Sequence, residues 1–349
     1  MKNKWGFYAF IRGIFRLYNR VYFRNFRVIG AENIPTNGGV LFSPNHQNAI
    51  VDPLMVGTTC NHDLHSLTRA DVFDGPLRPL LSLMHTLPVY RIRDGYQQLS
   101  RNTATFDHCR ALLGQKESLL MFSEGLHHEE YFLRRLSKGS SRLAMEAQKE
   151  HPNIPIYLQP VGLNYGHPRH PFTDVVVVYG EAFSLQSYLP DYDQAPAKTI
   201  NAVRDRLQKA MEDCLWLPID SPQYKEKEAL INRRNTSLPF ETLKKTLQQE
   251  HNNLRPPLKK GILQQLLIVI FSIPNLPIHV FLWLIRKQFT DVVFHGTVNY
   301  AGHLLFFPIW WALGAMGYGS EGNVFWAMGF ICSGICFFYL RQKTINKYL

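Results

Sequence analysis

The chain has 349 residues, enough for one large catalytic domain and a smaller additional region. Its formal net charge of +11 and its pI of about 9.4 favour an anionic partner, either a membrane surface or a phosphorylated substrate, because no nucleic-acid-binding motif is present. None of its five cysteines forms a close pair with metal-ligand spacing, which argues against a disulfide framework or a zinc site.

The first 27 residues contain seven basic side chains and no acidic one. Arg12, Arg16, Arg20 and Arg24 recur every four residues, so on a helix they form one stripe, with aromatic and aliphatic side chains around the rest. Arg12 interrupts the apolar run too early for a signal peptide or a spanning helix. We expect residues 1–27 to form an amphipathic helix on an anionic membrane surface. The alternative is a helix docked on the protein's own core.

Residues 28–220 alternate apolar runs with helical patterns, which predicts an α/β fold, a three-layer domain with helices on both faces of a sheet. Strands are expected at Phe26–Ile29, Val40–Phe42, Leu64–Thr68, Pro88–Arg91, Ser118–Phe122, Ile154–Val161 (interrupted at Pro160) and Val175–Tyr179. Helices are expected at Pro53–Cys60, Pro76–His85, Gln98–Leu113, Gly139–Glu150 and Thr199–Leu215.

The first candidate site follows the strand Val40–Phe42. Pro44 should end this strand, and Asp52-Pro53 has the form of a helix N-cap and first helical residue. His46 is therefore expected on a turn between a strand and a helix, where open α/β sheets place their binding crevices. A histidine there, oriented by the carboxylate of Asp52, would suit a general base. The alternative is a turn histidine that binds backbone carbonyls.

Further polar groups or tight turns follow other expected strands. Pro88-Val89-Tyr90 ends in Arg91, Leu120-Met121-Phe122-Ser123 ends in Glu124-Gly125, and Ile154–Leu163 contains Pro160. Parallel strands would bring these ends together with His46. Alternatively, Arg91 forms a structural ion pair, for example with Asp94, and Glu124 is a turn or N-cap carboxylate.

The order of these motifs resembles the glycerolipid acyltransferase family over about Val28–Glu181, through Asn45-His46…Asp52, Pro88–Arg91, Phe122–Gly125 and Pro160–Leu163, with Lys138-Gly139 before an alanine-rich helix. Five residues separate His46 from Asp52, which is similar to a branch of the family with His-x5-Asp-Pro rather than the usual four-residue spacing. His85 replaces a glycine of the family's second motif, and Leu126-His127 replaces the Thr-Arg of its third.

The resemblance implies acyl transfer from a thioester, with His46 as general base and Asp52 orienting its imidazole. It implies that Arg91 binds a phosphate or carboxylate, that Glu124 orients the acceptor, and that Asn45 also binds substrate. Gly125 would permit close backbone approach, and His128 would line the acceptor site. Lys138 would add charge against a phosphate, or is a solvated lysine.

The implied donor is acyl-CoA or acyl-carrier protein, and the implied acceptor is lysophosphatidic acid or glycerol 3-phosphate. Another lysolipid, such as a lyso-aminolipid, and a non-catalytic membrane protein on the same fold are the alternatives. No cofactor and no metal is expected, because the clusters His127-His128-Glu129 and Cys60, His62, His65 lack zinc-site spacing.

The remaining sequence divides into a polar part and an apolar part. Residues 221–260 are expected to form a solvated helical linker. Residues 262–285 carry no charge and are long enough to cross a bilayer, with Pro274–Pro277 at the middle. Basic residues on both sides favour a hairpin that enters and returns, with a kinked single span as the alternative. Residues 301–318 and 323–340 are expected to form a helical hairpin, and the catalytic domain should face the cytoplasm.

Overall fold

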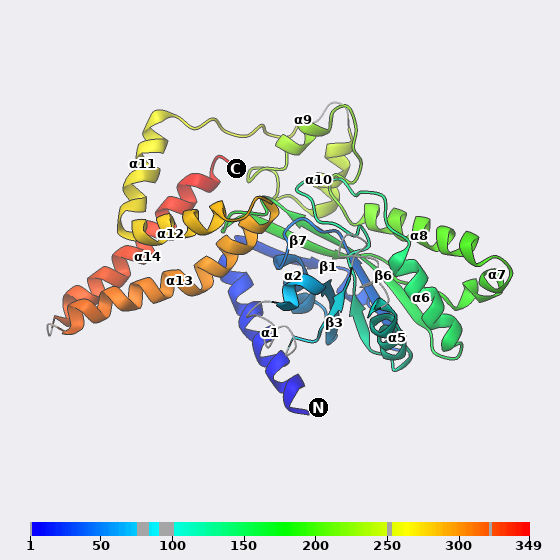
Figure 1. Ribbon diagram of the computed structural model, residues 1–349. Coiled ribbons are helices and arrows are strands. Elements are labelled where there is room, and N and C mark those ends of the chain that lie inside the picture. Colours follow the sequence, from blue (N-terminus) through cyan, green and yellow to red (C-terminus); the bar gives the residue numbers. More distant parts are fainter. Residues whose placement is uncertain (1, 75–83, 91–100, 250–252, 321–322) are drawn as a thin grey trace.

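The computed structural model describes residues 2–74, 84–90, 101–249, 253–320 and 323–349. A mixed eight-stranded sheet forms the centre, with the strand order β1-β7-β6-β2-β5-β3-β4 and β8 beside one end of β6 (Figure 1). The strands are β1 Asn25–Ile29, β2 Gly39–Pro44, β3 Leu64–Arg69, β4 Thr86–Val89, β5 Ser118–Leu120, β6 Ile156–Tyr165, β7 Asp174–Tyr179 and β8 Phe183–Ser184. From β6 to β4 all neighbours are parallel, whereas β7 and β8 run antiparallel to β6.

Helices cover both faces of the sheet, so the predicted three-layer α/β fold is confirmed. One face carries α5 Arg101–Gly114, α6 Gly139–Glu150, α7 Leu189–Gln194 and α8 Pro196–Asp213. The other face carries α1 Lys2–Tyr22 and α2 Val51–Thr59. Successive residues of β2 alternate between the layers, since Leu41 packs under α5, α6 and α8 whereas Val40 and Phe42 pack under α2. Short 3-10 turns complete the domain at Ala31–Asn33, Ala70–Asp74 and Gln186–Tyr188.

The expected strands all exist, with one difference at a proline. β2 ends at Pro44 as expected. Pro160 does not interrupt β6, which runs through it to Tyr165. Pro160 lies between Leu158, the last residue paired with β8, and Val161, the first paired with β7. The missing N–H of proline therefore falls where the neighbour on that edge changes. The helix expected at Pro76–His85 lies largely outside the described residues.

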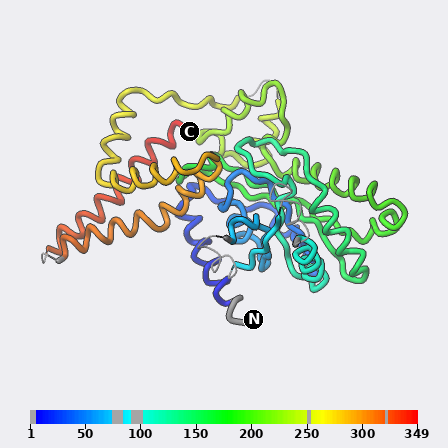
Figure 2. The backbone as a smooth tube through the Cα atoms, viewed as in Figure 1, coloured from blue at the N-terminus to red at the C-terminus, as the bar shows by residue number. Residues whose placement is uncertain are grey.

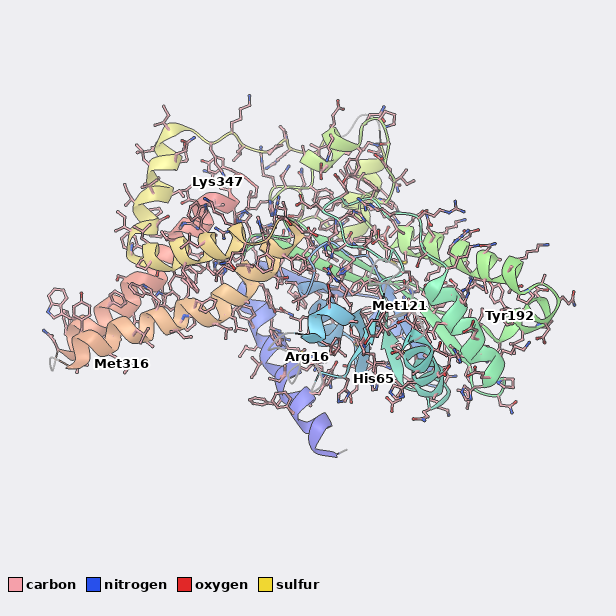
Figure 3. The ribbon with its side chains drawn as sticks, viewed as in Figure 1. Arg16, His65, Met121, Tyr192, Met316 and Lys347 are labelled. Carbon is pink, nitrogen blue, oxygen red and sulfur yellow. The ribbon has the colours of Figure 1, made fainter. Side chains whose placement is uncertain are left out.

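Arg12 and Arg16 of α1 contact the protein, whereas Arg20 is exposed. Arg16 donates to the carbonyls of Thr58 (2.7 Å) and Cys60 (3.4 Å) at the C-terminal end of α2, and Figure 3 shows Arg16 beside that helix. Arg12 pairs with Asp63 at 3.0 Å. Cations at a helix C-terminus stabilise its unpaired carbonyls. The stripe of α1 that stays exposed is instead apolar and consists of Phe10, Ile14, Leu17 and Val21.

Residues 221–249 form part of the folded domain, so the expectation of a solvated linker is wrong for this stretch. Two helices, α9 Tyr224–Ala229 and α10 Phe240–Gln248, pack against the sheet through Tyr224, Phe240, Leu243 and Leu247. These side chains cover Val176 and Val178, which point to that face of β7. Burial of several large apolar groups outweighs the polar composition of the segment.

The C-terminal region consists of α11 Ile262–Ser272, a 3-10 turn at Ile273–Asn275, α12 Leu276–Lys287, α13 Val293–Ser320 and α14 Val324–Asn346. Within the described residues, the stretches Ile262–Lys287 and Val324–Asn346 are long and apolar enough to cross a membrane. α11 and α12 run in different directions, and the turn between them is bonded to the other helices: Asn275 accepts from Trp311 and donates to Gly334, both at 2.8 Å.

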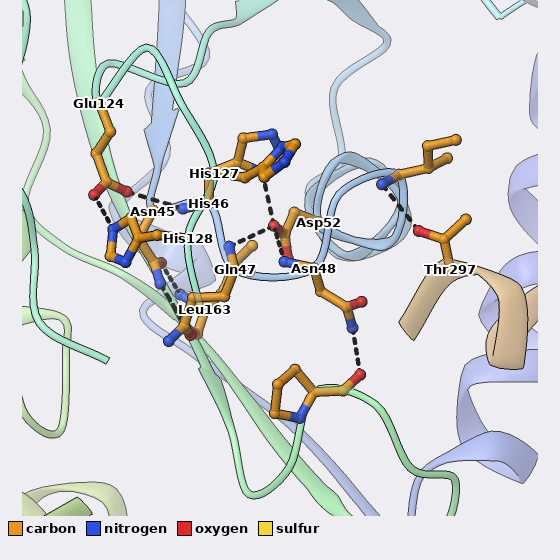
Figure 4. Close-up of polar contacts among 12 residues, drawn as sticks. Asn45, His46, Gln47, Asn48, Asp52, Glu124, His127, His128, Leu163 and Thr297 are labelled. Atoms are coloured by element: carbon orange, nitrogen blue, oxygen red, sulfur yellow. Dashed lines mark hydrogen bonds and ion pairs between the residues drawn. The ribbon is translucent and has the colours of Figure 1, made fainter. Parts of the chain in front are cut away.

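α13 and α14 form the expected helical hairpin, which extends away from the α/β domain (Figure 2). Figure 3 shows Met316 near its distant tip and Lys347 at the end beside the domain. The hairpin is bonded to the domain there, because Asn346 donates to the carbonyl of Pro171 at 2.5 Å. The start of α13 lies next to the loop that follows β2, because the backbone N–H of Ile50 donates to the hydroxyl of Thr297 at 3.3 Å (Figure 4).

Candidate active site

The loop between β2 and α2 positions the first candidate residues. His46 lies on this loop, as the sequence predicts. The prediction that Asp52 caps α2 is wrong: the helix begins at Val51, with Ile50 at the N-cap position, so Asp52 lies in the first turn. Its carboxylate instead reaches back to the loop. Ala49 has a φ of 40°, so the loop is held in a conformation that costs energy for a residue other than glycine.

His46 and Asp52 are in direct contact. Nδ1 of His46 donates to Oδ2 of Asp52 at 2.8 Å, and the same oxygen accepts the backbone N–H groups of Gln47 (2.8 Å) and Asn48 (2.7 Å) (Figure 4). The Asp52 side chain is fully buried. The carboxylate is therefore held by several donors, and it orients the imidazole with Nδ1–H inward and Nε2 outward.

Tyr165 completes the surroundings of Asp52. It lies at the end of β6, and its hydroxyl donates to Oδ1 of Asp52 at 2.7 Å. Burial, and then the negative charge of Asp52, raise the pKa of Tyr165 well above its usual range, so the hydroxyl keeps its proton. Each carboxylate oxygen thus has a donor, and the contact links the loop to a strand 113 residues further along the chain.

The imidazole of His46 is fixed on both sides. It stacks on Phe122, with the ring centroids 3.7 Å apart, and it makes an edge contact with His127 at 5.3 Å. His127 in turn donates from Nε2 to Asp291 at 2.5 Å, just before α13. Nε2 of His46 has no hydrogen-bond partner among the described residues.

A largely apolar cavity of about 570 Å³ begins at His46. It follows one face of α2, whose residues Ile50, Pro53, Leu54 and Gly57 recur at helical spacing. α1, β3 and β5 form the other walls, with Tyr8, Phe15, Leu64, Leu67 and Leu120. Ile50 and Gly57 are seven residues apart, which corresponds to about 10 Å along the helix. A flexible apolar chain fits such a space.

Three of the residues expected to bind substrate instead support the loop. The fully buried carboxylate of Glu124 accepts the backbone N–H of His46 at 3.0 Å and the Nε2–H of His128 at 2.7 Å. Asn45 is bonded in both directions to the backbone of Leu163 on β6, at 2.7 and 3.1 Å. None of Asn45, Glu124 and His128 lines the cavity. Their geometry supports a role in positioning His46 rather than in contacting substrate.

The other residues expected to bind substrate differ in whether they line the cavity. Gly125 lines the cavity with a φ of 78°, and the space around its Cα is open, so its backbone is accessible to a ligand. Lys138 precedes α6, is exposed, and does not line the cavity. Arg91 and Asp94 lie outside the described residues. His85, at the position where the resemblance expects glycine, has a φ of 54°, a conformation that glycine adopts at lower cost.

The sequence did not indicate three contacts at this site: Tyr165 with Asp52, Phe122 with His46, and His127 with Asp291. Phe122 was visible as the end of an expected strand, but stacking depends on where the neighbouring strand lies. Tyr165 and Asp291 lie far from His46 along the chain, and no local pattern marks them. Among the described residues, no three His, Cys, Asp or Glu side chains are grouped to hold a metal ion.

Known proteins are similar to this chain in sequence and in structure. Residues 25–164 match the family model described as Acyltransferase. The chain is 25% identical over 122 residues to "Uncharacterized acyltransferase C1718.04" of Schizosaccharomyces pombe, a match that covers 35% of this chain and only 18% of that protein. The solved structure of the 1-acyl-sn-glycerophosphate (LPA) acyltransferase, PlsC, from Thermotoga maritima is similar with a TM-score of 0.43 and 15% identity, over 61% of this chain and 83% of that one.

Proposed function

We propose that this chain, whose residues 25–164 match the family model described as Acyltransferase, transfers a fatty acyl group from a thioester to a lipid hydroxyl. The observation that carries the proposal is the pair His46–Asp52, in which Nε2 of His46 has no partner among the described residues and His46 lines an apolar cavity. A base beside an open apolar space suits a substrate with one reactive polar group and one long apolar chain.

In the proposed reaction, Nε2 of His46 takes the proton from the acceptor hydroxyl while the hydroxyl oxygen attacks the thioester carbonyl. The new C–O bond forms, the C–S bond breaks, and the proton passes from the imidazolium to the departing thiolate. Asp52, 2.8 Å from Nδ1, stabilises the imidazolium. Placing the base contributes roughly 10²–10⁴-fold to the rate, and positioning of the two substrates supplies much of the rest.

The acyl chain would occupy the cavity along α2, with its carbonyl carbon next to His46. Acyl-CoA or acyl-carrier protein is the proposed donor, and lysophosphatidic acid or glycerol 3-phosphate the proposed acceptor, in phospholipid biosynthesis. The replacement of the expected Thr-Arg by Leu126-His127 favours, as a second candidate, an acceptor with another headgroup, such as a lyso-aminolipid. We place the catalytic domain on the cytoplasmic face, with the C-terminal helices in the membrane.

The test is acyl transfer by the purified full chain from labelled acyl-CoA to a panel of lysolipids and glycerol 3-phosphate. His46→Ala should lower kcat by about 10²-fold or more, because the base is removed. His108→Ala, an exposed histidine on α5, is the matched control and should leave kcat unchanged. Equal turnover by the wild type and His46→Ala would refute the mechanism, and absence of transfer to every acceptor would favour a non-catalytic protein. The acceptor used fastest identifies the headgroup.

A further inference from the structure

A second cavity, of about 540 Å³, lies where the C-terminal helices meet the α/β domain. Its walls come from the loop between β6 and β7, from α12, from the start of α13 and from the end of α14. Phe294 of α13 lines the first cavity and the next residue, His295, lines the second. The two cavities have no lining residue in common, and nothing in the proposed reaction uses the second one.

The second cavity is strongly basic. Arg169, Arg286 and Arg341 line it, and none of its lining residues carries a carboxylate. Arg286 donates to the amide oxygen of Asn299 at 2.5 Å and Arg341 to the hydroxyl of Ser272 at 2.8 Å, so both bind neutral groups. Within the part of the chain that the structure describes, neither forms an ion pair. Both guanidinium groups are partly buried, and withdrawing such a charge from water without a counter-charge costs free energy unless an anion is bound.

Histidines add hydrogen-bonding atoms that have no partner in the protein. The Nε2 atoms of His279, His295 and His303 are buried and lack a hydrogen-bond partner. Burial, then His167 and Arg169, and then Arg341 lower the pKa of His170, in keeping with a concentration of positive charge at this place. A metal cation would be repelled by the three arginines, whereas an anion with several oxygens would be attracted.

The position of the cavity indicates where such an anion comes from. It lies at the polar ends of apolar helices, beside Lys287 at the end of α12 and Lys343 in the last turn of α14. Val280 and Trp283 line it and are each 45% exposed on the apolar surface of α12. This combination, charges inside and apolar side chains at the edge, matches the depth at which a bilayer places its headgroups.

We propose that Arg286, Arg341 and the histidines His279 and His303 form a binding site for the phosphate-bearing headgroup of an anionic membrane lipid. The arginines would bind the phosphate oxygens, and the imidazoles would bind phosphate oxygens or headgroup hydroxyls. The acyl chains of this lipid would lie along α12. Such a lipid would contact both the C-terminal helices and the loop after β6, and so would stabilise their packing. This role does not depend on whether the chain transfers acyl groups.

The test measures the melting temperature of the full chain in neutral phosphatidylcholine–detergent micelles as phosphatidylglycerol is added at constant ionic strength. A second arm adds inorganic phosphate instead. The wild type should be stabilised in a saturable manner by phosphatidylglycerol. Arg286→Gln and Arg341→Gln should each shift the half-saturating concentration upward by about tenfold or more, because each removes a charge-assisted contact. Lys209→Gln removes an exposed charge on α8, which does not line the cavity, and should behave as the wild type.

The outcomes separate the two sources of phosphate. Stabilisation by phosphatidylglycerol alone supports the headgroup site, whereas equal stabilisation by inorganic phosphate overturns it in favour of a free-phosphate site. Identical titrations for the wild type and both arginine variants, or no saturable effect, also overturn it. If Arg341→Gln does not fold, Arg286→Gln and His279→Gln provide the same comparison. The experiment measures lipid binding and not acyl transfer. The headgroup site can therefore be refuted while the acyltransferase proposal stands, and acyl transfer can be refuted while the headgroup site stands.

Discussion

Replacing Asp52 by asparagine removes the carboxylate charge and keeps the shape of the side chain. The imidazolium that forms during the proposed reaction lies 2.8 Å from Oδ2 of Asp52. At an effective dielectric constant of about 20, two unit charges at that separation interact by about 6 kcal/mol. An amide oxygen at the same place retains part of this interaction. We therefore expect a loss of about 3–6 kcal/mol in the transition state, a fall in kcat of about 10²–10⁴-fold.

The fold should survive this change. The asparagine oxygen can accept from Nδ1 of His46 and from the backbone N–H groups of Gln47 and Asn48, while its amide can donate to the hydroxyl oxygen of Tyr165. The stability loss should be roughly 1–2 kcal/mol, because charge-assisted hydrogen bonds are replaced by neutral ones. KM for the acyl donor should change little, since Asp52 does not line the cavity.

The assay measures kcat and KM with labelled acyl-CoA, together with the melting temperature of each variant. Asp205→Asn, an exposed carboxylate on α8, is the matched control. The reasoning is refuted if Asp52→Asn melts like the wild type and keeps kcat within about threefold, because the charge of Asp52 would then contribute almost nothing to the transition state.

Three further predictions concern other parts of the molecule. Tyr165→Phe leaves Oδ1 of the buried Asp52 without its donor, so the protein should lose about 1–3 kcal/mol of stability and kcat should fall; an unchanged melting temperature and kcat would contradict the assigned contact. Gly57→Leu adds a side chain to the wall of the cavity, so in a mixture of acyl-CoA donors the preference should move to shorter chains, and continued use of the longest donor would exclude this cavity as the acyl site. Burial, then Arg169 and Lys260, lower the pKa of His167 to about 4, so the unfolded chain binds a proton at this histidine more readily than the folded chain does. The free energy of unfolding should therefore decrease as pH falls from about 6.5 to about 4, and His167→Gln should reduce that decrease by about 1–3 kcal/mol in chemical denaturation. Parallel plots of unfolding free energy against pH for the two proteins would disprove this prediction.

Local patterns in the sequence predicted much of the fold. The seven expected strands exist because apolar runs bounded by proline, glycine and polar residues leave few other ways to bury their side chains. The pairing of His46 with Asp52 was also predictable, since five residues separate them and the turn between a strand and a helix brings such neighbours together. The motif order predicted a resemblance to acyltransferases, and residues 25–164 match the family model described as Acyltransferase.

The same patterns did not predict which surface each helix packs against. A stripe of arginines on a helix fits an anionic membrane and the C-terminal end of another helix equally well, and the structure shows Arg12 and Arg16 at α2. The polar residues 221–249 suggested a solvated linker, yet the few apolar side chains among them complete the packing on β7. In both cases the partner surface decides the outcome, and that surface is built from distant residues.

The sequence by itself determined most of the secondary-structure elements, the α/β class and the pairing of His46 with Asp52, because each depends on side chains within a few positions of one another. Only the tertiary structure decided that Tyr165 binds Asp52, that Glu124 lies behind His46, and that α12, α13 and α14 enclose a basic cavity against the domain. These contacts join segments that are far apart along the chain, and they depend on strand register and on helix packing. No local periodicity encodes them.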